Sequence, residues 1–583
     1  MSVLDWTLVI GLNGAIICYG LFIGRETKVS SDWFLASRRL PWWIVGLSLY
    51  ATAIDSSDMV ADSGGTYTLG ISYFVNSWVG TVIGWFIAAN FIVLPMYRAG
   101  MYTNAEYLEA RFGPSTRLIS ALVQVQYRTL VLGNITTTIY LTTSVVFGWE
   151  ASAWWLVFLI ALLATAYTAV GGLRSVAVTD ALQAVVMFTA SLVFFGIAWS
   201  HVGGWEGIET KLAASDKTLP AKVLHVGHEH TQVTDVSQNS PDQIAQRLLL
   251  GGEHDQQTKT IRESTPAWLF CTQFIIAGIA FSIVNHTQSM RLLGSKTEWD
   301  LKMSVVLAGL ILIVVTFFNL IMGIIGRALY PELQSLPVEQ ALQANADAIY
   351  PILVRDLTGF GLKGLVVAGI LAAAFSTYDS IGSTLSALLT RDVYARFFVP
   401  DREDHHYLRV GQWLTPVIIF GSFLYVPFLL KRGMVVFYLD LVSAFVVPLL
   451  TIYLMGFFTK VHRRSGTIGL SCGVIYGIVR MLTPVCVEHF NVSFLPAIML
   501  NEAASYIWSM VITAGTMFVY SLFAGWETEH KLRHLERAGW LRNSQLEVTH
   551  ITSDPEPAFT KLPFLLGIAV VLLGMYLSFV VFW

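Results

Sequence analysis

The feature that most constrains this chain is a series of apolar stretches, each of which is long enough to cross a lipid bilayer as a helix. A membrane-spanning helix needs about 20 predominantly apolar residues. The stretches lie near residues 5–24, 41–63, 71–97, 118–147, 152–171, 178–201, 266–289, 303–329, 361–389, 410–430, 434–458, 466–484, 500–524 and 563–582. They predict an all-α integral membrane protein with about 14 transmembrane helices.

The composition agrees with a membrane protein and excludes several other classes. Only 13% of the 583 residues are charged, whereas soluble proteins have about 25%. The net charge is −3, so we expect neither a nucleic-acid binder nor a disordered chain. The four cysteines are far apart, and no nucleotide-binding loop, catalytic triad or zinc motif occurs. We therefore expect no disulfide framework, no enzyme and no ATP-driven pump.

Basic residues in the short loops predict the orientation of the chain, because lysine and arginine concentrate in cytoplasmic loops. Every second loop is basic. The basic residues of these loops are Arg25, Lys28, Arg38, Arg39, Arg98, Arg111, Arg117, Arg174, Arg291, Lys296, Lys302, Arg391, Arg396, Arg402, Arg409, Lys460, Arg463, Arg464, Lys531, Arg533, Arg537 and Arg542. These residues share one side if both termini lie outside, and Lys431 and Arg432 are the main exception. We predict a multi-pass protein of the plasma (cell or inner) membrane.

Two long polar connections stand out between the spans. Residues 201–265 lie outside in this topology and contain His225, His228 and His230 in the run HVGHEH. A metal site is one interpretation, but a flexible outer loop is favoured, because one short histidine cluster is a weak signal. The inner segment 525–561 has helix-like charge spacing, which predicts a solvated or interfacial helix.

Acidic side chains gather in the second predicted span, where charge is costly and usually marks a function. Asp55, Asp58 and Asp62 have the spacing i, i+3 and i+7, which places three carboxylates on one helical face. They cannot all ionise in apolar surroundings without cations or water nearby. Gly64 and Gly65 follow directly and predict a broken span whose free carbonyl groups bind ligands. The alternative is a helix end that dips into water.

The ninth predicted span carries oxygen-bearing side chains at helical spacing. They are Ser376, Thr377, Asp379, Ser380, Ser383 and Thr384. Hydroxyl and carbonyl oxygens can replace the hydration shell of a monovalent cation, although serine and threonine in membrane helices also serve close packing. Asp379 favours the cation site, because a buried carboxylate needs a positive partner.

Two more charged residues lie inside predicted spans. Asp180 is expected to be a cation ligand. A salt bridge to Arg174 is the alternative, but a separation of six residues points the two side chains to different faces. Arg128 is the only arginine well inside a predicted span. It either pairs with one of the aspartates, which we favour, or binds a carboxylate of a substrate.

Several blocks of the sequence resemble the sodium/solute symporter family, which includes sodium-coupled sugar, proline, sialic acid, iodide and monocarboxylate carriers. The blocks are DWFLASRRLPWW, TNAEYLEARFG, YTAVGGLRSVAVTDALQ, NHTQSMRLLGSKTEWDLK, AAAFSTYDSIGSTLSALLTRDVY and FVVPLLTIYLMGFFTKVHRRSG. The resemblance implies an inverted 5+5 helix repeat (a LeuT-type core) with extra N- and C-terminal helices. The implied parts are 1–40 (first helix and cytoplasmic loop), 41–201 (first repeat), 202–265 (extracellular polar loop), 266–458 (second repeat) and 459–583 (three last helices with a cytoplasmic loop).

The resemblance also implies one or two bound sodium ions. Carried over by position, the first site would use oxygens of Ser56, Met59, Ala373, Ser376 and Thr377. The second site, which only some members hold, would use Asp180, Ser376, Asp379 and Ser380. An aspartate at position 379, where a hydroxyl is usual, makes this second site more negative.

A substrate cavity is expected beside the first sodium site. Its predicted lining is Asp55, Asp58, Asp62, Asn76, Trp78, Gln126, Arg128, Phe281 and Asn285, with Phe281 as the outer gate by similarity. The aspartates of the cavity and the ion sites outnumber their one arginine, which disfavours an anionic solute. Sugar-binding residues of the family are missing at Gly278 and Leu439, while the run Ser57-Asp58-Met59 resembles proline carriers.

We therefore expect a sodium-coupled secondary active symporter that imports a small polar organic solute (sugar, polyol or amino-acid-like) across the lipid bilayer by alternating access. Sodium would bind where spans two and nine approach and would stabilise the outward-open state. A proton-coupled carrier of the same fold, a transport-fold sensor and a sodium channel are the alternatives.

Overall fold

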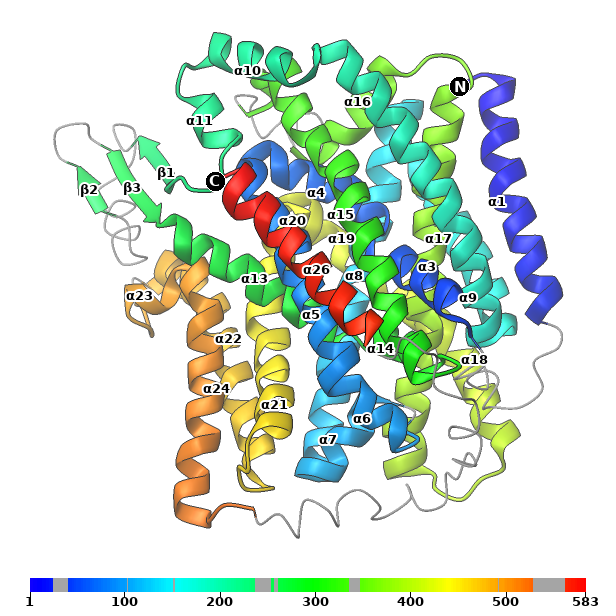
Figure 1. Cartoon of the computed structure of the whole chain (residues 1–583), viewed down its shortest axis with the longest axis vertical. Coiled ribbons are helices and arrows are strands. Elements are labelled where there is room, and N and C mark those ends of the chain that lie inside the picture. Colours follow the sequence, from blue (N-terminus) through cyan, green and yellow to red (C-terminus); the bar gives the residue numbers. More distant parts are fainter. Residues whose placement is uncertain are drawn as a thin grey trace.

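The described part of the chain is a helical bundle with one small sheet at its edge (Figure 1). The computed structural model describes residues 1–24, 40–101, 103–149, 152–235, 253–255, 260–334, 346–490, 492–527 and 561–583. Both termini lie towards the same end of the bundle, which we call the upper end, and α7 (Asn104–Phe112) lies at the opposite, lower end (Figure 1). The predicted all-α membrane architecture is confirmed, while most of the predicted inner helix at 525–561 falls outside the described residues.

Twelve helices of the described residues are long and apolar enough to cross a membrane, and two shorter apolar helices, Trp42–Ala53 and Ala153–Ala166, accompany them. Helix α9 (Ala153–Val202) covers both the fifth and the sixth predicted spans. A straight helix of its 50 residues would measure about 75 Å, which is more than twice a hydrocarbon core of about 30 Å. The multi-pass architecture therefore stands, and the number of fourteen crossings stays a prediction.

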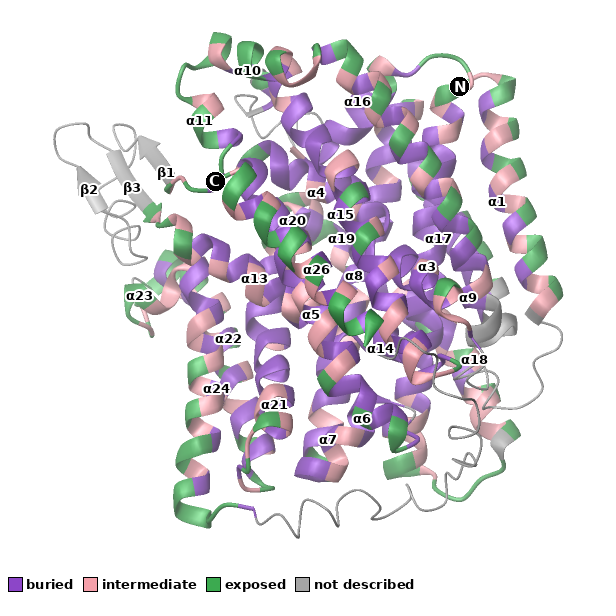
Figure 2. Ribbon diagram, viewed as in Figure 1, coloured by how far each residue is buried: buried purple, intermediate pink, exposed green. Residues whose placement is uncertain are grey.

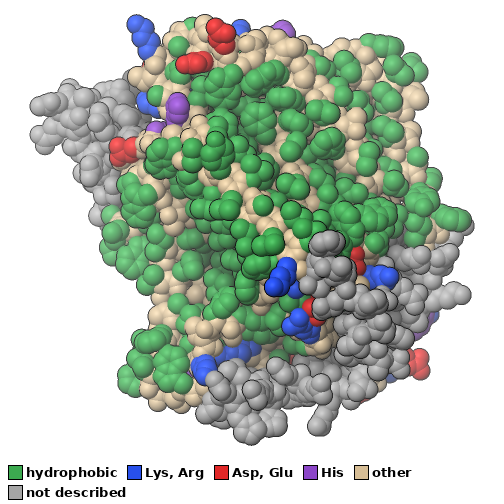
Figure 3. Space-filling view, in the orientation of Figure 1, with side chains coloured by type: hydrophobic (Ala, Val, Ile, Leu, Met, Phe, Trp, Pro, Cys, Tyr) green, Lys and Arg blue, Asp and Glu red, His purple; other side chains and the backbone are tan. Residues whose placement is uncertain are grey.

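The surface of the bundle has the polarity that a bilayer requires. Hydrophobic side chains cover most of the visible face, and the few charged ones lie mostly towards its ends (Figure 3). Large exposed side chains of the outer helices, such as Phe158, Trp413 and Phe428, are apolar. Buried residues fill the centre of the bundle (Figure 2), so polar side chains found there need partners within the protein.

Two helices of the bundle are broken in the middle. Helix α3 (Trp42–Ala53) ends at Ile54, whose backbone is extended, and α4 (Ser56–Leu69) begins two residues later. In the same way α13 (Ala267–Val284) is separated from α14 (His286–Leu293) by the extended residue Asn285. Each second half is capped by a side chain, because Asp55 accepts hydrogen bonds from the backbone N–H groups of Ser57 and Asp58, and Asn285 accepts one from Thr287.

The break in the second predicted span is confirmed, but its predicted position was wrong. Gly64 and Gly65 lie inside α4 and do not interrupt it. They serve close packing instead, because a Cβ atom at Gly64 would lie 2.5 Å from Oδ1 and 2.8 Å from Cα of Asp347. Asp347 belongs to η7 (Ala346–Ala348), and its carboxylate accepts a hydrogen bond from the backbone N–H of Met434, at the start of α20 (Met434–Leu441).

Helix α17 (Leu362–Leu388) lies at the centre of the bundle and is buried along almost its whole length. It packs against α9, α8 (Pro114–Phe147), α18 (Asp404–Gly421) and α1 (Val3–Gly24). A π-helical segment, η8 (Leu389–Phe398), continues it towards the lower end. Its hydroxyl-bearing residues therefore face protein rather than lipid.

The remaining elements complete the bundle in chain order. They are η2 (Gly70–Tyr73), η3 (Asn76–Thr81), α5 (Val82–Ile87), η4 (Ala88–Ile92), α6 (Val93–Arg98), α15 (Glu298–Leu329), η5 (Pro331–Gln334), α16 (Ile349–Leu357), η9 (Ser422–Tyr425), α19 (Val426–Arg432), η10 (Val442–Val446), α21 (Val447–Phe458), α22 (Ser465–Phe490), α23 (Ala497–Leu500), α24 (Glu502–Ala524), α26 (Leu562–Tyr576) and η13 (Leu577–Val581). Several π-helical and 3-10 segments interrupt long spans, so these spans deviate from a regular α-helix.

The connection after α9 has structure of its own, in contrast to the predicted flexible loop. It forms α10 (Gly204–Ser215), α11 (Leu219–Val223) and an antiparallel sheet of β1 (His230–Asp235), β3 (Thr260–Thr265) and β2 (Glu253–Asp255), in that order. The ring of His230 stacks on Phe270 at 3.6 Å, and burial lowers the pKa of His230 to about 3. No group of three or more metal-ligating side chains occurs in the part of the chain that the structure describes.

The close approach at Gly64 yields a first prediction. Gly64→Ala should lower the melting temperature of the purified protein, because the added methyl group meets the backbone of Asp347 and overpacking typically costs about 1–3 kcal/mol. Gly14→Ala in α1 is the matched control, since nothing lies within 4 Å of its Cβ position. An unchanged melting temperature for Gly64→Ala would contradict this prediction, because it would show that Asp347 shifts away from the added methyl group at little cost.

Candidate functional site

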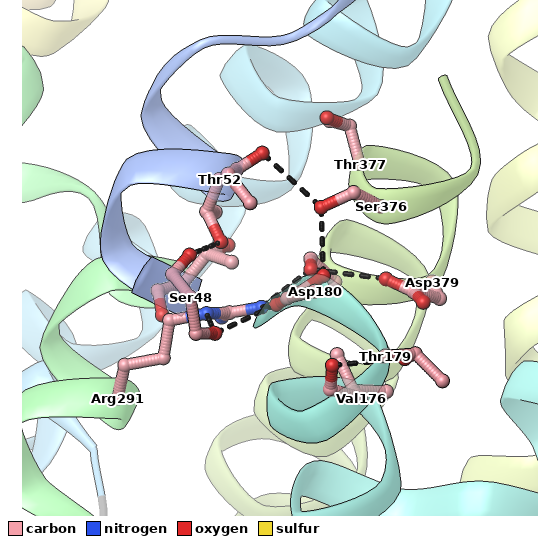
Figure 4. Close-up of polar contacts among 12 residues, drawn as sticks. Ser48, Thr52, Val176, Thr179, Asp180, Arg291, Ser376, Thr377 and Asp379 are labelled. Carbon is pink, nitrogen blue, oxygen red and sulfur yellow. Dashed lines mark hydrogen bonds and ion pairs between the residues drawn. The ribbon is translucent and has the colours of Figure 1, made fainter. Parts of the chain in front are cut away.

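A fully buried ion pair lies at the centre of the bundle. Nη2 of Arg291, from α14, lies 2.8 Å from Oδ2 of Asp180, from α9, and both side chains have an exposed fraction of 0%. Ser48 of α3 donates to Asp180 Oδ2 at 2.7 Å and accepts from Arg291 Nε at 2.8 Å. Arg291 also donates to the backbone carbonyl of Thr287 at 2.9 Å and to the hydroxyl of Ser380. Figure 4 shows Asp180 between the α3 and α14 side chains and those of α17.

The partner of Asp180 was missed by the sequence analysis. Arg291 was counted among the basic loop residues, yet it is buried. The side chain of Arg174, the alternative partner, lies outside the described part of the structure. A buried carboxylate with a guanidinium and two serine hydroxyl groups as partners is well satisfied, so Asp180 does not need a sodium ion to be stable there.

Helix α17 meets the broken end of α3 through Ser376. The Ser376 hydroxyl lies 2.7 Å from Asp180 Oδ1 and 3.1 Å from the backbone carbonyl of Ala51 (Figure 4). The Thr377 hydroxyl lies 3.2 Å from the carbonyl of Ala373. Because the last carbonyl groups of a helix have no partner within the helix, this junction gathers several oxygen atoms in a buried place.

The structure corrects the predicted partners of Ser376. Ser56 and Met59 lie inside α4, where their carbonyl groups follow the helical hydrogen-bond pattern, and the carbonyl of Met59 also accepts from the Ser63 hydroxyl at 2.5 Å. The carbonyl beside Ser376 is that of Ala51, in α3. The break between α3 and α4 lies earlier in the span than Gly64 and Gly65 predicted.

A cavity with a free volume of about 70 Å³ opens next to this junction. Five predicted residues line it, namely Asp55, Asp58, Asp62, Asn76 and Phe281. The lining also includes residues that the prediction missed, among them Tyr73, Thr81, Asn134, Thr316, Asn319 and Tyr438. No lysine, arginine or histidine is among the residues that line the cavity.

Four predicted substrate residues do not line the cavity. Trp78 is buried, and its indole N–H donates to the carbonyl of Ile313 at 3.1 Å. Gln126 and Arg128 lie on α8, and Asn285 caps α14. Lone polar residues in apolar runs, such as Asn134 in LVLGNITTT and Asn319 in TFFNLIM, were the signal that could have identified the missed lining.

The three acids of α4 have different tasks. Asp55 and Asp58 form a capping box at the start of α4, since Asp58 Oδ2 accepts from the backbone N–H of Asp55 at 2.6 Å. Asp62 accepts from the Tyr73 hydroxyl at 2.7 Å. The first two carboxylates therefore stabilise the broken helix, and the third is available to a ligand in the cavity.

A second ionic cluster lies at the lower end. Arg117 of α8 pairs with Asp392 of η8 and with Glu109 of α7, and Arg396 bonds to Glu109 at 2.7 Å. Burial alone would raise the pKa of Glu109, but hydrogen bonds from Arg396 and Arg117 hold this pKa below its usual value. These contacts join three elements from different parts of the chain, so they close the lower side of the bundle.

Broken helices around a buried polar centre, inside an apolar bundle, are the architecture of membrane transporters rather than of enzymes. A model of the sodium:solute symporter family matches residues 33–477 of the sequence. The chain belongs to this family, as the sequence blocks predicted, and its members are sodium-coupled transporters.

Individual proteins show the same relationship over most of their length. The sodium/glucose cotransporter of Vibrio parahaemolyticus is 26% identical over 487 residues, which cover 81% of this chain and 83% of the relative. Sodium/glucose cotransporter 4 of Danio rerio is 27% identical over 551 residues, which cover 90% of this chain and 78% of the relative.

Solved structures identify the fold. A Na⁺-coupled sialic acid symporter in a substrate-bound outward-open state superposes with a TM-score of 0.68 at 19% identity and covers 89% of this chain and 98% of its own. The nucleobase-cation symporter Mhp1 reaches a TM-score of 0.51 at 13% identity and covers 86% of this chain and 98% of its own. The fold is therefore the LeuT-type transporter fold.

The buried pair of Arg291 and Asp180 yields the second prediction. Arg291→Gln should destabilise the protein by roughly 3–5 kcal/mol, because it leaves the Asp180 carboxylate buried without its positive partner. The double variant Asp180→Asn/Arg291→Gln should recover much of the lost melting temperature. Arg355→Gln, which removes an exposed pair with Asp356, is the control and should change stability by about 1 kcal/mol or less. Additive effects of the two single changes would refute the pairing.

Proposed function

We propose that this protein is a sodium-coupled symporter that imports a small polar organic solute by alternating access. The observation that carries this proposal is the junction between the broken end of α3 and α17, where buried oxygen atoms gather beside a carboxylate-lined cavity. Membership of the sodium:solute symporter family supports sodium as the coupling ion.

The first sodium site in this proposal lies at that junction. Its ligands are carbonyl groups at the end of α3, from Ala51 to Ile54, together with the carbonyl of Ala373 and the hydroxyl groups of Ser376 and Thr377. Oxygen ligands of this kind replace the hydration shell of a hard monovalent cation. Because the ligands come from two helices that are far apart in sequence, bound sodium holds α3 against α17.

A second sodium ion is proposed beside the ion pair, with Asp180, Ser376, Asp379 and Ser380 as its ligands. The support is the gathering of buried oxygen atoms, because the Ser376 hydroxyl lies 2.7 Å from Asp180 Oδ1 and the Ser380 hydroxyl lies 3.0 Å from Asp379 Oδ1.

The coupling follows from the position of the sodium sites. Sodium enters from the side with the higher concentration and stabilises the state in which α3 and α17 are in contact, which shapes the cavity for the solute. When the two helices separate, both sodium and solute lose ligands and leave. A membrane potential contributes about 2.3 kcal/mol per charge and 100 mV, so each sodium ion adds substantially to accumulation.

The proposed solute is a sugar, a polyol or an amino-acid-like molecule. The named relatives are sodium/glucose cotransporters, which supports a sugar as one of the candidate solutes. The amide groups of Asn76, Asn134 and Asn319 and the rings of Tyr73 and Phe281 line the cavity and suit the polar and apolar groups of a small organic molecule.

A proton-coupled carrier of the same fold is the second candidate, because Asp58 and Asp62 are within interaction distance of one another in the cavity. Two neighbouring carboxylates favour the uptake of a proton. Solute uptake at fixed pH with sodium or with potassium separates the two mechanisms, since only a proton-coupled carrier works equally well in both.

The proposed setting is a cell membrane with both termini outside, so that the upper end of the bundle faces outwards (Figure 1). In this setting residues 41–201 and 266–458 form the two repeats, and each repeat begins with one of the two broken helices.

Loss of a hydroxyl ligand yields the third prediction. Ser376→Ala and Thr377→Ala should each raise the sodium concentration for half-maximal solute uptake by roughly 10- to 100-fold, since a bond to a charged group typically contributes about 1.5–3 kcal/mol. Ser386→Ala is the matched control, because its buried hydroxyl on the same helix bonds only to the carbonyl of Ser383. Unchanged sodium dependence in both variants would exclude the first site.

The second site yields the fourth prediction. Asp379→Asn should lower the number of sodium ions transported with each solute, because it removes one of the two proposed carboxylate ligands of the second site. The measurement is the reversal potential of solute-coupled current in proteoliposomes at several sodium gradients. A variant with the same ratio of sodium to solute as the natural protein would exclude the second site.

A further inference from the structure

Side chains with unsatisfied hydrogen-bonding atoms gather where α13 breaks, below the cavity. They are Arg128, Gln124, Asn285 and His286, and each has an exposed fraction of 3% or less. All three guanidinium nitrogens of Arg128, both ring nitrogens of His286, Nδ2 of Asn285 and Oε1 of Gln124 lack a hydrogen-bond partner among the described residues. We call these four residues the floor cluster.

The floor cluster is one place in the fold rather than four scattered defects. Gln124 donates to the carbonyl of Val284, the last residue of α13, and Asn285 and His286 follow at once. Arg128 lies one helical turn after Gln124 on α8, and its charge interacts with His286. Two helices therefore present these groups to one another.

The cavity lies about one helical turn, or roughly 5.4 Å, above the floor cluster. On α8 the cavity is lined by Val131, three residues after Arg128, and on α13 by Phe281, four residues before Asn285. Arg128 also interacts electrostatically with Asp55 and Tyr438, both of which line the cavity. The floor cluster thus lies beneath the cavity, about one helical turn below the residues that line it.

A buried guanidinium without partners is unusual because its desolvation is costly. The expected pairing of Arg128 with an aspartate does not occur as an ion pair among the described residues, and the nearest π-face is the ring of Tyr127, whose centre lies 5.7 Å from Cζ. Every free nitrogen of Arg128 and the amide nitrogen of Asn285 are donors. Such a set of donors fits an anion with two oxygen atoms.

We propose that the floor cluster binds the carboxylate of the transported solute, so that the solute is a zwitterion of the amino-acid type. Arg128 forks onto the carboxylate, Asn285 and His286 donate to it, and a cationic nitrogen of the solute lies above, next to Asp62. This inference rests on the proposed transport function and names the substrate class. A zwitterion satisfies both Asp62 and the floor cluster, whereas a neutral sugar leaves the guanidinium of Arg128 unpaired.

The test compares acids with their amides. Thermal shifts of the purified full-length protein are measured in sodium methanesulfonate with proline and prolinamide, alanine and alaninamide, glycine betaine and choline, and glucose. The solutes with a carboxylate should stabilise the protein, and the counterparts that lack it, as well as glucose, should not. Arg128→Gln should weaken carboxylate binding on the order of 10- to 100-fold, while Arg98→Gln, at an exposed pair with Glu298, should leave it unchanged.

The stability of the ligand-free protein separates a binding role from a structural one. Because Arg128 makes no hydrogen bond within the described structure, Arg128→Gln should not lower the melting temperature of the ligand-free protein. A loss as large as that of Arg291→Gln would show that Arg128 is structural and would overturn the proposal.

Three other results would also overturn it. They are equal stabilisation by acid and amide, no stabilisation by any carboxylate, and an Arg128-dependent shift when chloride alone replaces methanesulfonate, which would assign the cluster to a free anion. Failure of the sodium-coupled mechanism looks different, because Arg128-dependent carboxylate binding that is equally strong in potassium would leave this site intact and remove only the coupling ion.

Discussion

The rest of the structure depends on one constraint, which is that a backbone N–H or C=O group inside a bilayer must find a partner within the protein. A helix that breaks in the middle of the membrane exposes such groups at two new ends. Asp55 and Asn285 satisfy the N–H groups at the start of α4 and α14. The carbonyl end of α3 is not capped in this way, and Ser376 of α17 reaches one of its oxygen atoms, that of Ala51. The break therefore produces a stable half-helix and an oxygen-rich end that suits a cation.

Charge balance in the interior explains which polar groups are structural and which are available to ligands. Arg291 and Asp180 satisfy one another through a shared network with Ser48, so they fix the arrangement of α14, α9 and α3. Arg128 is buried to a similar degree, but among the described residues it forms no such ion pair. In our proposal, one arginine is therefore structural and the other is available to a ligand.

Apolar patterning was sufficient to predict the helical membrane fold, since an apolar stretch of about 20 residues has few alternatives. The position of the break was not predicted correctly, because Gly64 and Gly65 were interpreted as helix breakers. The pattern of Asp55 followed three residues later by Asp58 is a capping signal that marks the true position. The role of Ala51 could not be predicted from residue types, since a backbone carbonyl has no sequence signature. Arg291 was misplaced because a basic residue near a helix end is typical of a loop.

The contacts of Ser376 explain how one small group can connect the ion sites to the cavity. Its hydroxyl lies within hydrogen-bond distance of both the Ala51 carbonyl and the Asp180 carboxylate, so it lies between the broken end of α3 and the buried ion pair. Four residues after Ala51, Asp55 caps α4 and lines the cavity. A movement of α3 away from α17 would therefore change the proposed sodium ligands and the wall of the cavity together. Coupling of this kind needs no long pathway, because a single broken helix contributes to both the proposed sodium site and the cavity.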